Sequence, residues 1–250
     1  QRIREFRLQL HPQKCTFGVT AGKMLGFLIT QRGIEVDPSK IKAILEMPPP
    51  RTEKEVRGFL GKVQFIRRFI SKLTLTCEPL FGLLKKGKKF QWDGRCQAAF
   101  EKIKEYLQHP PVLSPPEPGR PLILYLSVTE TTMGCMLAQE SEDKVERAIY
   151  YLSKKMLEYE TRYTPLEKAC LALVWATRKL RHYLLAHSVM LVSRLDPIKY
   201  LIEKPALTGR LARWLLLLSE FDLKYVTRKS VKGRAVAEFL ADHPVKGGEA

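Results

Sequence analysis

Several features that would narrow the class of this protein are missing from its sequence. The 5 cysteines form no C-x-x-C pair, and the 5 histidines do not stand at metal-ligand spacing with them. This scatter excludes a zinc ribbon and a disulfide framework, and it is typical of reduced thiols. The sequence also lacks a membrane-length apolar run and a signal peptide at its start. We therefore expect an intracellular protein that is not secreted and has no membrane partner.

A balance of charge is missing as well. Lys and Arg number 43 against 26 Asp and Glu, which gives a formal net charge of +17. The surplus is uneven, because residues 1–120 contain 23 basic and 11 acidic residues, whereas residues 121–250 contain 20 and 15. Such a surplus favours a polyanionic partner, and nucleic acid is the first candidate. We expect residues 1–120 to make most of the contacts with it. Charge that serves only solubility is the alternative, and it fits so large a surplus less well.

The beginning of the chain predicts short strands. Apolar and β-branched residues at Cys15–Val19 and Met24–Thr30, joined by Thr20–Lys23, indicate a hairpin. Gly33 permits a turn into a third strand, Ile34–Val36.

Helices are predicted from residue 37 onward. Asp37 is the expected N-cap of the first helix, and Thr52–Glu55 has the capping-box pattern of the second. The second helix, expected to continue over Val56–Lys72, has an apolar stripe and a basic face. Its two interior glycines each lower helix propensity by about 1 kcal/mol, which indicates that something approaches the backbone. The candidate phosphate contacts are Arg57, Gly58, Gly61, Lys62, Arg67, Arg68 and Lys72, and a merely solvated basic face is the alternative.

A lysine cluster and a proline-rich segment follow. Lys85, Lys86, Lys88 and Lys89 are further candidates for phosphate contact, with a solvated loop as the alternative. Asp93 predicts the N-cap of another helix. Closely spaced prolines in residues 110–120 predict a stiff linker and a domain boundary.

Strands and helices alternate beyond this linker, which is typical of a mixed α/β layer architecture. Trp175, on the longest expected helix, is predicted to be a core residue rather than a base-stacking platform. The expected strands are Leu122–Ser127, Met133–Gln139, Ala148–Ser153, Val189–Ser193 and Leu223–Val226, and the expected helices are Tyr163–Leu184, Pro197–Ile202, Arg210–Glu220 and Ala235–Ala241.

An ordered series of motifs resembles a known family over about residues 5–243. In chain order they resemble the end of a reverse transcriptase palm, the thumb, the connecting region and a ribonuclease H-like domain. Together they resemble the polyprotein of gypsy-type LTR retrotransposons, plant lineages especially. The segments that carry the resemblance before the last domain are Phe6–Phe17, Leu25–Phe27, Gly33–Lys40, Pro48–Ile70, Phe90–Asp93 and Pro111–Leu113.

The resemblance implies an α+β chain with a definite organisation. Residues 1–36 would end the palm, and residues 37–109 would form the thumb and connection helices. After the linker at 110–120, residues 121–243 would form the ribonuclease H-like domain, a mixed five-stranded sheet flanked by helices. Residues 244–250 would be a tail.

Two departures from the family pattern bear on activity. The family's polymerase uses an aromatic-x-Asp-Asp hairpin, and no Asp-Asp pair occurs here. Its ribonuclease H site uses clustered carboxylates to hold two Mg²⁺ ions. The matching positions here are Ser127, Ala169 and Arg194, and only Glu238 remains acidic. We therefore expect no catalytic residues and no metal or other cofactor in this chain, although the intact family uses Mg²⁺.

The expected function is structural. The chain would bind an RNA–DNA hybrid or duplex without sequence preference, beside the other parts of its polyprotein, in a cytoplasmic particle or the nucleus. One alternative is an active Mg²⁺-dependent ribonuclease H that uses displaced carboxylates at Glu130, Glu167 or Asp196. The other is a domesticated or decayed host copy without activity.

Overall fold

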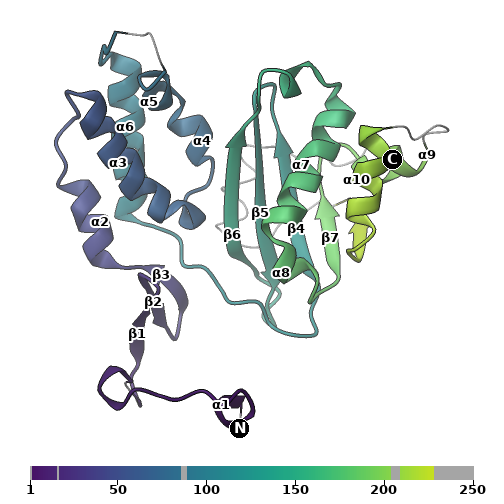
Figure 1. The fold of residues 1–250 in the computed structure, drawn as a ribbon, viewed down its shortest axis with the longest axis horizontal. Coiled ribbons are helices and arrows are strands. Elements are labelled where there is room, and N and C mark those ends of the chain that lie inside the picture. Colours follow the sequence, from purple (N-terminus) through teal and green to yellow (C-terminus); the bar gives the residue numbers. More distant parts are fainter. Residues whose placement is uncertain (1, 16, 86–88, 204–208, 228–250) are drawn as a thin grey trace.

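The computed structural model describes residues 2–15, 17–85, 89–203 and 209–227 (Figure 1). A layer of helices between residues 38 and 108 lies beside a layer built on a sheet between residues 122 and 225. This arrangement confirms the α+β architecture that the sequence predicts. The expected helix at Ala235–Ala241 and the tail at 244–250 lie outside the described residues. Within the described ranges, no helix has the length and apolarity needed to cross a bilayer.

A three-stranded antiparallel sheet follows two short helical turns, α1 (Arg2–Glu5) and η1 (Pro12–Lys14). Its strands are β1 (Ala21–Met24), β2 (Phe27–Thr30) and β3 (Gly33–Val36), in that order.

The position predicted for the first hairpin is wrong. The turn is Leu25–Gly26, with φ values of 51° and 81°, and the segment predicted as its connection supplies strand β1. A two-residue hairpin turn needs this left-handed backbone, which glycine adopts most easily. A Cβ atom on Gly26 would also lie 2.4 Å from the Phe65 ring, so the glycine lets the hairpin approach the helical layer.

The helical layer begins with two capped helices. In α2 (Pro38–Leu45), Asp37 accepts a hydrogen bond from the Ser39 amide at 3.0 Å, which confirms the predicted N-cap. The Lys23 ammonium, 2.9 Å away, and the Ser39 amide lower the pKa of Asp37 to about 2. In α3 (Glu53–Phe65), Thr52 accepts from the Glu55 amide at 3.3 Å. The Glu55 carboxylate accepts from the Arg51 amide instead of Thr52, so the predicted capping box is half formed.

The single helix predicted over Val56–Lys72 is wrong in its C-terminal part. Helix α3 ends at Phe65, η2 (Arg67–Phe69) follows, and Lys72 has a left-handed φ of 53° before α4 (Leu73–Thr76). The break buries Phe69 and Ile70, and it lets η2 and α4 pack against the large sheet. The layer ends with α5 (Glu78–Gly82) and α6 (Gly94–Gln108), which Asp93 caps as predicted by accepting from the Cys96 amide at 2.8 Å.

The large sheet has the predicted five strands in the order β6-β5-β4-β7-β8. Its antiparallel side consists of β4 (Leu122–Val128), β5 (Thr132–Glu140) and β6 (Glu146–Lys155). Strands β7 (Val189–Val192) and β8 (Leu223–Tyr225) continue it in parallel with β4.

Helices cover one face of this sheet, with α7 lying across β4 and β5 (Figure 1). The long helix predicted over Tyr163–Leu184 is in fact interrupted at the buried residue Leu180. The helical elements after β6 are η3 (Glu160–Arg162), α7 (Pro165–Lys179), α8 (Arg181–Leu184), α9 (Pro197–Glu203) and α10 (Arg210–Leu218).

The two faces of the sheet belong to different cores. Leu124 and Leu191 share a cluster of buried side chains with α7, whereas Tyr125 and Val192 share one with the helical layer. Alternate strand residues point to opposite faces, so strands β4 to β7 contribute to both cores. The sheet is therefore the common wall of the two layers.

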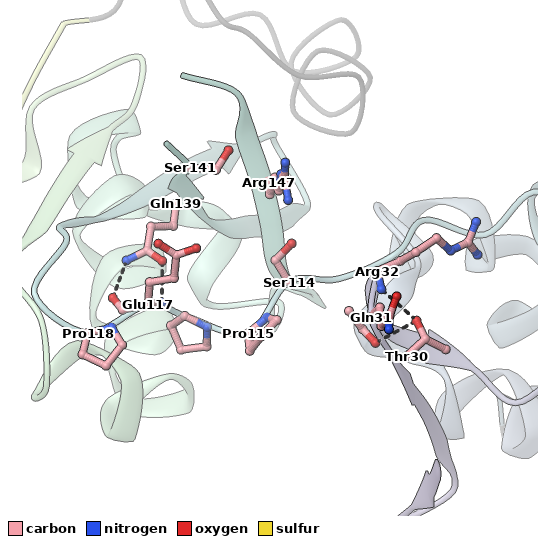
Figure 2. A pocket seen from close by; sticks show the side chains of 12 residues that line it. Thr30, Gln31, Arg32, Ser114, Pro115, Glu117, Pro118, Gln139, Ser141 and Arg147 are labelled. Atoms are coloured by element: carbon pink, nitrogen blue, oxygen red, sulfur yellow. Dashed lines mark hydrogen bonds between the residues drawn. The ribbon is translucent and has the colours of Figure 1, made fainter. Parts of the chain in front are cut away.

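The proline-rich linker is attached to both sheets. Leu113 forms a β-bridge with Ile34, and the Ser114 amide donates to the Ala148 carbonyl at 2.8 Å. Figure 2 shows Gln139 facing the linker, where its side chain accepts from the Glu117 amide at 2.7 Å. The linker is therefore part of the packed structure rather than a free spacer.

Candidate functional site

A cavity of about 220 Å³ lies where the resemblance places the ribonuclease H site. Three elements form it: the end of β4 with the loop after it, the first turns of α7, and the end of β7. Its walls are mostly apolar, and its two cations are Lys168 of α7 and Arg194 of the segment that follows β7. The lining residues are Leu126, Val128, Thr129, Glu130, Pro165, Lys168, Ala169, Ser193, Arg194 and Leu195.

The structure brings the family's metal-ligand positions to one end of the sheet. Ala169 and Arg194 line the cavity directly. Ser127 is half-buried at the end of β4 and does not line the cavity, whereas its neighbours Leu126 and Val128 do. Tyr125 pairs with Val192, so Ser127 and Arg194 each follow paired residues of adjacent strands. Glu238 lies outside the described residues.

Lys168 is the charged residue most deeply placed in this cavity. Its side chain is 7% exposed, and its ammonium lies 2.8 Å from the Glu130 carboxylate, whose side chain is 92% exposed. The hydrogen bond and the charge of Lys168 lower the pKa of Glu130. A buried cation requires such a partner, because desolvating an unpaired charge is costly. Glu130 is thus already committed to neutralising Lys168.

The other two nearby carboxylates are engaged in capping helices. Glu167 completes a capping box with Thr164 and lies 2.9 Å from Arg210. Burial opposes ionisation of Glu167, but hydrogen bonds from Thr164 and Arg210 outweigh it and lower the pKa. Asp196 accepts hydrogen bonds from the Ile198 and Lys199 amides, each at 3.0 Å. Across the described ranges, no group of three or more His, Cys, Asp or Glu side chains is placed to hold a metal ion.

Most of the basic residues predicted to contact phosphate are exposed. Arg57 and Lys62 lie on α3, and Arg57 is 3.9 Å from Glu53 in a weak ion pair. A Cβ atom on Gly58 or Gly61 would meet nothing within 4 Å. Packing within the described chain therefore does not require these two glycines, and the surface above them is open.

The remaining predicted residues separate into different places. Arg67 is exposed on η2, and Lys72 is half-buried, where burial and the nearby Lys102 lower its pKa. Lys85 and Lys89 border a hollow of about 490 Å³. Lys86 and Lys88 lie outside the described residues.

Arg68 does not lie on the basic face. It is half-buried between the layers, with its guanidinium 5.3 Å from the centre of the Phe27 ring and 4.7 Å from that of Tyr150. Its Nε atom is buried and has no hydrogen-bond partner among the described residues. This position gives Arg68 a role in packing, which sequence spacing alone did not indicate.

Sequence analysis missed several cations that fold next to the predicted ones. Lys154 on β6 and Lys179 at the end of α7 line the same hollow as Arg67. Lys155 borders the hollow that contains Lys85 and Lys89. These lysines come from segments far from residues 57–89, so no local pattern links them to that surface.

Residues 117–221 match the family model described as an RNase H-like domain found in reverse transcriptase. The chain is 31% identical over 241 residues to the retrovirus-related Pol polyprotein from transposon 297 of Drosophila melanogaster. That match covers 96% of this chain and 22% of the polyprotein, so the chain spans about a fifth of its relative's length.

Solved structures of foamy viral protease-reverse transcriptase have the same fold. The dRH form in complex with double-stranded DNA has a TM-score of 0.71 and 25% identity, covering 84% of this chain and 38% of that one. The complex with an RNA/DNA hybrid has a TM-score of 0.70 and 25% identity, covering 85% and 30%. Residues 117–221 therefore form an RNase H-like domain of the kind found in reverse transcriptases, within a chain similar over 96% of its length to a retrotransposon polyprotein.

Proposed function

We propose that this chain is a nucleic-acid-binding and structural segment of a reverse transcriptase–ribonuclease H polyprotein, without catalytic activity of its own. The helical layer would meet the phosphates of an RNA–DNA hybrid or duplex. The RNase H-like domain would serve as a scaffold that no longer cleaves. The finer assignment, also part of the proposal, is a gypsy-type element of a plant lineage, acting in a cytoplasmic particle or the nucleus beside the other parts of its polyprotein.

The observation that carries the proposal is the charge of the cavity. Arg194 and Lys168 line it, and Ala169 stands where the family pattern has a glutamate. A positive charge 4 Å from a divalent cation opposes it by about 4 kcal/mol per unit charge at an effective dielectric of 20. Magnesium needs near-octahedral oxygen ligands, which alanine and arginine cannot supply. The residues present therefore do not fit the two Mg²⁺ ions that the family pattern implies.

The contacts of the neighbouring carboxylates count against the rival function, an active ribonuclease H. Glu130 would have to leave Lys168, and Asp196 would have to leave the two amides that it caps. Glu167 would have to leave both Thr164 and Arg210. Each release would leave behind a buried cation or uncapped amides. A displaced-carboxylate site would thus require several rearrangements at once.

Two observations support the binding half of the proposal. The exposed cations Arg57 and Lys62 lie on α3 next to Gly58 and Gly61, whose surface is open. Contact through cations and open backbone is the usual mode of sequence-independent phosphate binding. The foamy viral relatives of this fold are described in complex with double-stranded DNA and with an RNA/DNA hybrid.

One pair of assays tests both the lack of cleavage and the binding of nucleic acid. An RNA–DNA hybrid with end-labelled RNA is incubated with the full chain in Mg²⁺ or Mn²⁺, and binding of the same hybrid is followed by fluorescence anisotropy across salt concentrations. We expect salt-dependent binding without cleavage. Cleavage that Glu238→Ala abolishes would establish the rival nuclease, and absence of hybrid binding would refute the binding role.

A domesticated or decayed host copy is the remaining alternative. It predicts the same cavity and the same lack of cleavage, so the assays above do not separate it from a live element. Sequencing the parent transcript does, because a live element should encode an intact aromatic-x-Asp-Asp hairpin upstream of this segment.

A further inference from the structure

A groove of about 450 Å³ lies where the helical layer meets the RNase H-like domain. One wall comes from α3, η2, α4 and α5, and the other from β6 and α7. The layers are joined at this groove by Ser153, whose hydroxyl accepts from the Thr74 amide at 3.0 Å. The groove is also lined by Arg67, Lys154, Trp175 and Lys179.

The groove has an uncompensated positive charge. Lys154 is neutralised, because its ammonium lies 3.2 Å from the buried Glu160 carboxylate. Arg67 and Lys179 are both exposed and form no ion pair with a described residue, and no carboxylate lines the groove. The hollow beside Lys85, by contrast, contains Glu78 and Asp93, and the former metal cavity contains Glu130. An oxyanion is therefore favoured in this groove by two cations with no opposing acid.

Trp175 adds an aromatic surface to the groove that these cations line. The sequence predicted it as a core residue, and it does pack against the core, but it is only half-buried and also lines the groove. Aromatic side chains set among cations are the usual platform for unpaired nucleotides, because every base has a face that stacks. The indole and the two cations together match a base joined to a phosphate.

We propose that this groove binds a segment of single-stranded nucleic acid, with a base against Trp175 and phosphate oxygens at Lys179 and Arg67. Its volume is in the range of small-ligand sites. A base in a duplex is stacked and paired, and it would have to leave the helix to reach the indole. The groove therefore takes a single-stranded end or overhang, whereas the basic face of α3 is the surface proposed for a duplex. Arg67 belongs to the groove, because it lies on η2 and not on α3.

The test compares a labelled oligodeoxythymidine single strand with a labelled RNA–DNA hybrid, using fluorescence anisotropy and the full chain. Lys179→Gln should weaken single-strand binding and reduce the magnitude of its salt slope by about 0.7, the loss of one phosphate contact. The matched control is Lys199→Gln, an equally charged change on exposed α9, which should leave single-strand binding unchanged. Hybrid binding should be unaffected by either variant.

Trp175→Leu should weaken single-strand binding about ten-fold, and Trp175→Phe should retain most of it, because phenylalanine also stacks. A thermal melt of each variant verifies folding, and Lys179→Gln decides alone if Trp175→Leu unfolds. Single-strand affinity that Lys179→Gln leaves unchanged, or an equal loss for strand and hybrid, would overturn the proposal. Failure of the unsubstituted chain to bind hybrid would refute the proposed function but would not contradict single-strand binding in this groove.

Discussion

Lys168 and Arg68 are both withdrawn from solvent, but by different kinds of contact. Lys168 lies on α7 with its ammonium 2.8 Å from an exposed carboxylate, Glu130. Arg68 lies between the layers against the rings of Phe27, Phe69 and Tyr150, and its Nε atom has no hydrogen-bond partner among the described residues. An ammonium is compact and strongly hydrated, so its burial requires a counter-charge. A guanidinium is planar and more weakly hydrated, so aromatic faces can replace part of its water.

This difference separates a contact that joins the layers from a contact that is local to the cavity. Arg68 joins the three-stranded sheet, η2 and the large sheet, so it acts at the junction of the layers. Lys168 and Glu130 form a local pair in a cavity that Arg194 also lines. The buried leucines around α7 belong to the core of the domain and do not depend on this pair.

The largest effect is expected from reversing the charge of the cavity. The combined change Ser127→Asp, Ala169→Glu and Arg194→Asp should create Mn²⁺ binding and metal-dependent cleavage of an RNA–DNA hybrid, because it supplies three carboxylates and removes a cation. Isothermal titration and the labelled-hybrid assay measure the two outcomes. The matched control, Ser127→Asn, Ala169→Gln and Arg194→Asn, has nearly the same shape without the charge and should gain neither. Metal binding by both would show that charge is not the deciding property.

Truncating an apolar core residue of the domain should lower stability far more than replacing Arg68 or Lys168. Leu173 is fully buried on α7, so Leu173→Ala should lower the free energy of unfolding by about 2–5 kcal/mol. Leu216→Ala on α10 removes the same atoms from a side chain that is 73% exposed and should change stability by less than about 0.5 kcal/mol. Urea unfolding gives both values. Equal losses would mean that α7 does not carry the core.

Substitutions of Arg68 should show that the aromatic site between the layers stabilises a guanidinium more than an ammonium. Arg68→Lys keeps the charge but loses the planar stacking, so we expect a destabilisation of about 1 kcal/mol. Arg68→Met keeps the packing of the stem and removes the unpartnered Nε atom, so its loss should be smaller. Urea unfolding of the two variants ranks them, and the reverse order would contradict the role assigned to the rings.

Among these variants, replacing Lys168 should change stability least. Lys168→Met should be neutral within about 1 kcal/mol or stabilising at pH 7, because methionine fills a similar volume and Glu130 remains in solvent. In the unsubstituted chain, Lys168 lowers the pKa of Glu130. This contribution to stability is present above the unfolded carboxyl pKa of about 4.3 and is lost as the pH falls through the lowered value.

Stability measured from pH 7 down to pH 3 should therefore fall less steeply in Lys168→Met than in the unsubstituted chain. An unchanged pH profile would show that the pair does not couple to folding.

The large sheet could be predicted from sequence because its strands are apolar, β-branched and separated by clear turns. The first hairpin was misplaced because Leu25–Gly26 is a weak turn signal, whereas the residues before it look equally apolar. The break after α3 was missed because Ile66, Phe69 and Ile70 have a spacing that fits a continuous helix as well as a turn. Local patterns do not distinguish these cases, since tertiary packing decides them.

The candidate site shows the same limit. The resemblance located Ser127, Ala169 and Arg194, and the structure places them at one end of the sheet. The partnership of Lys168 with Glu130 and the stacking of Arg68 on Tyr150 join residues far apart in the chain. Their charge and ring types are visible in the sequence, but the contacts that give them a role arise only on folding.

The shared wall between the two cores has a consequence for synthesis of the protein. The helical layer leaves the ribosome first, yet η2 and α4 pack against β6, and Ser153 of that strand accepts the hydrogen bond from Thr74. Until β6 has emerged, the nascent chain presents Phe69 and Ile70 to solvent. Exposed surface of this kind is what chaperones recognise. A transcript truncated before β6 would therefore yield a chaperone client rather than a smaller functional protein.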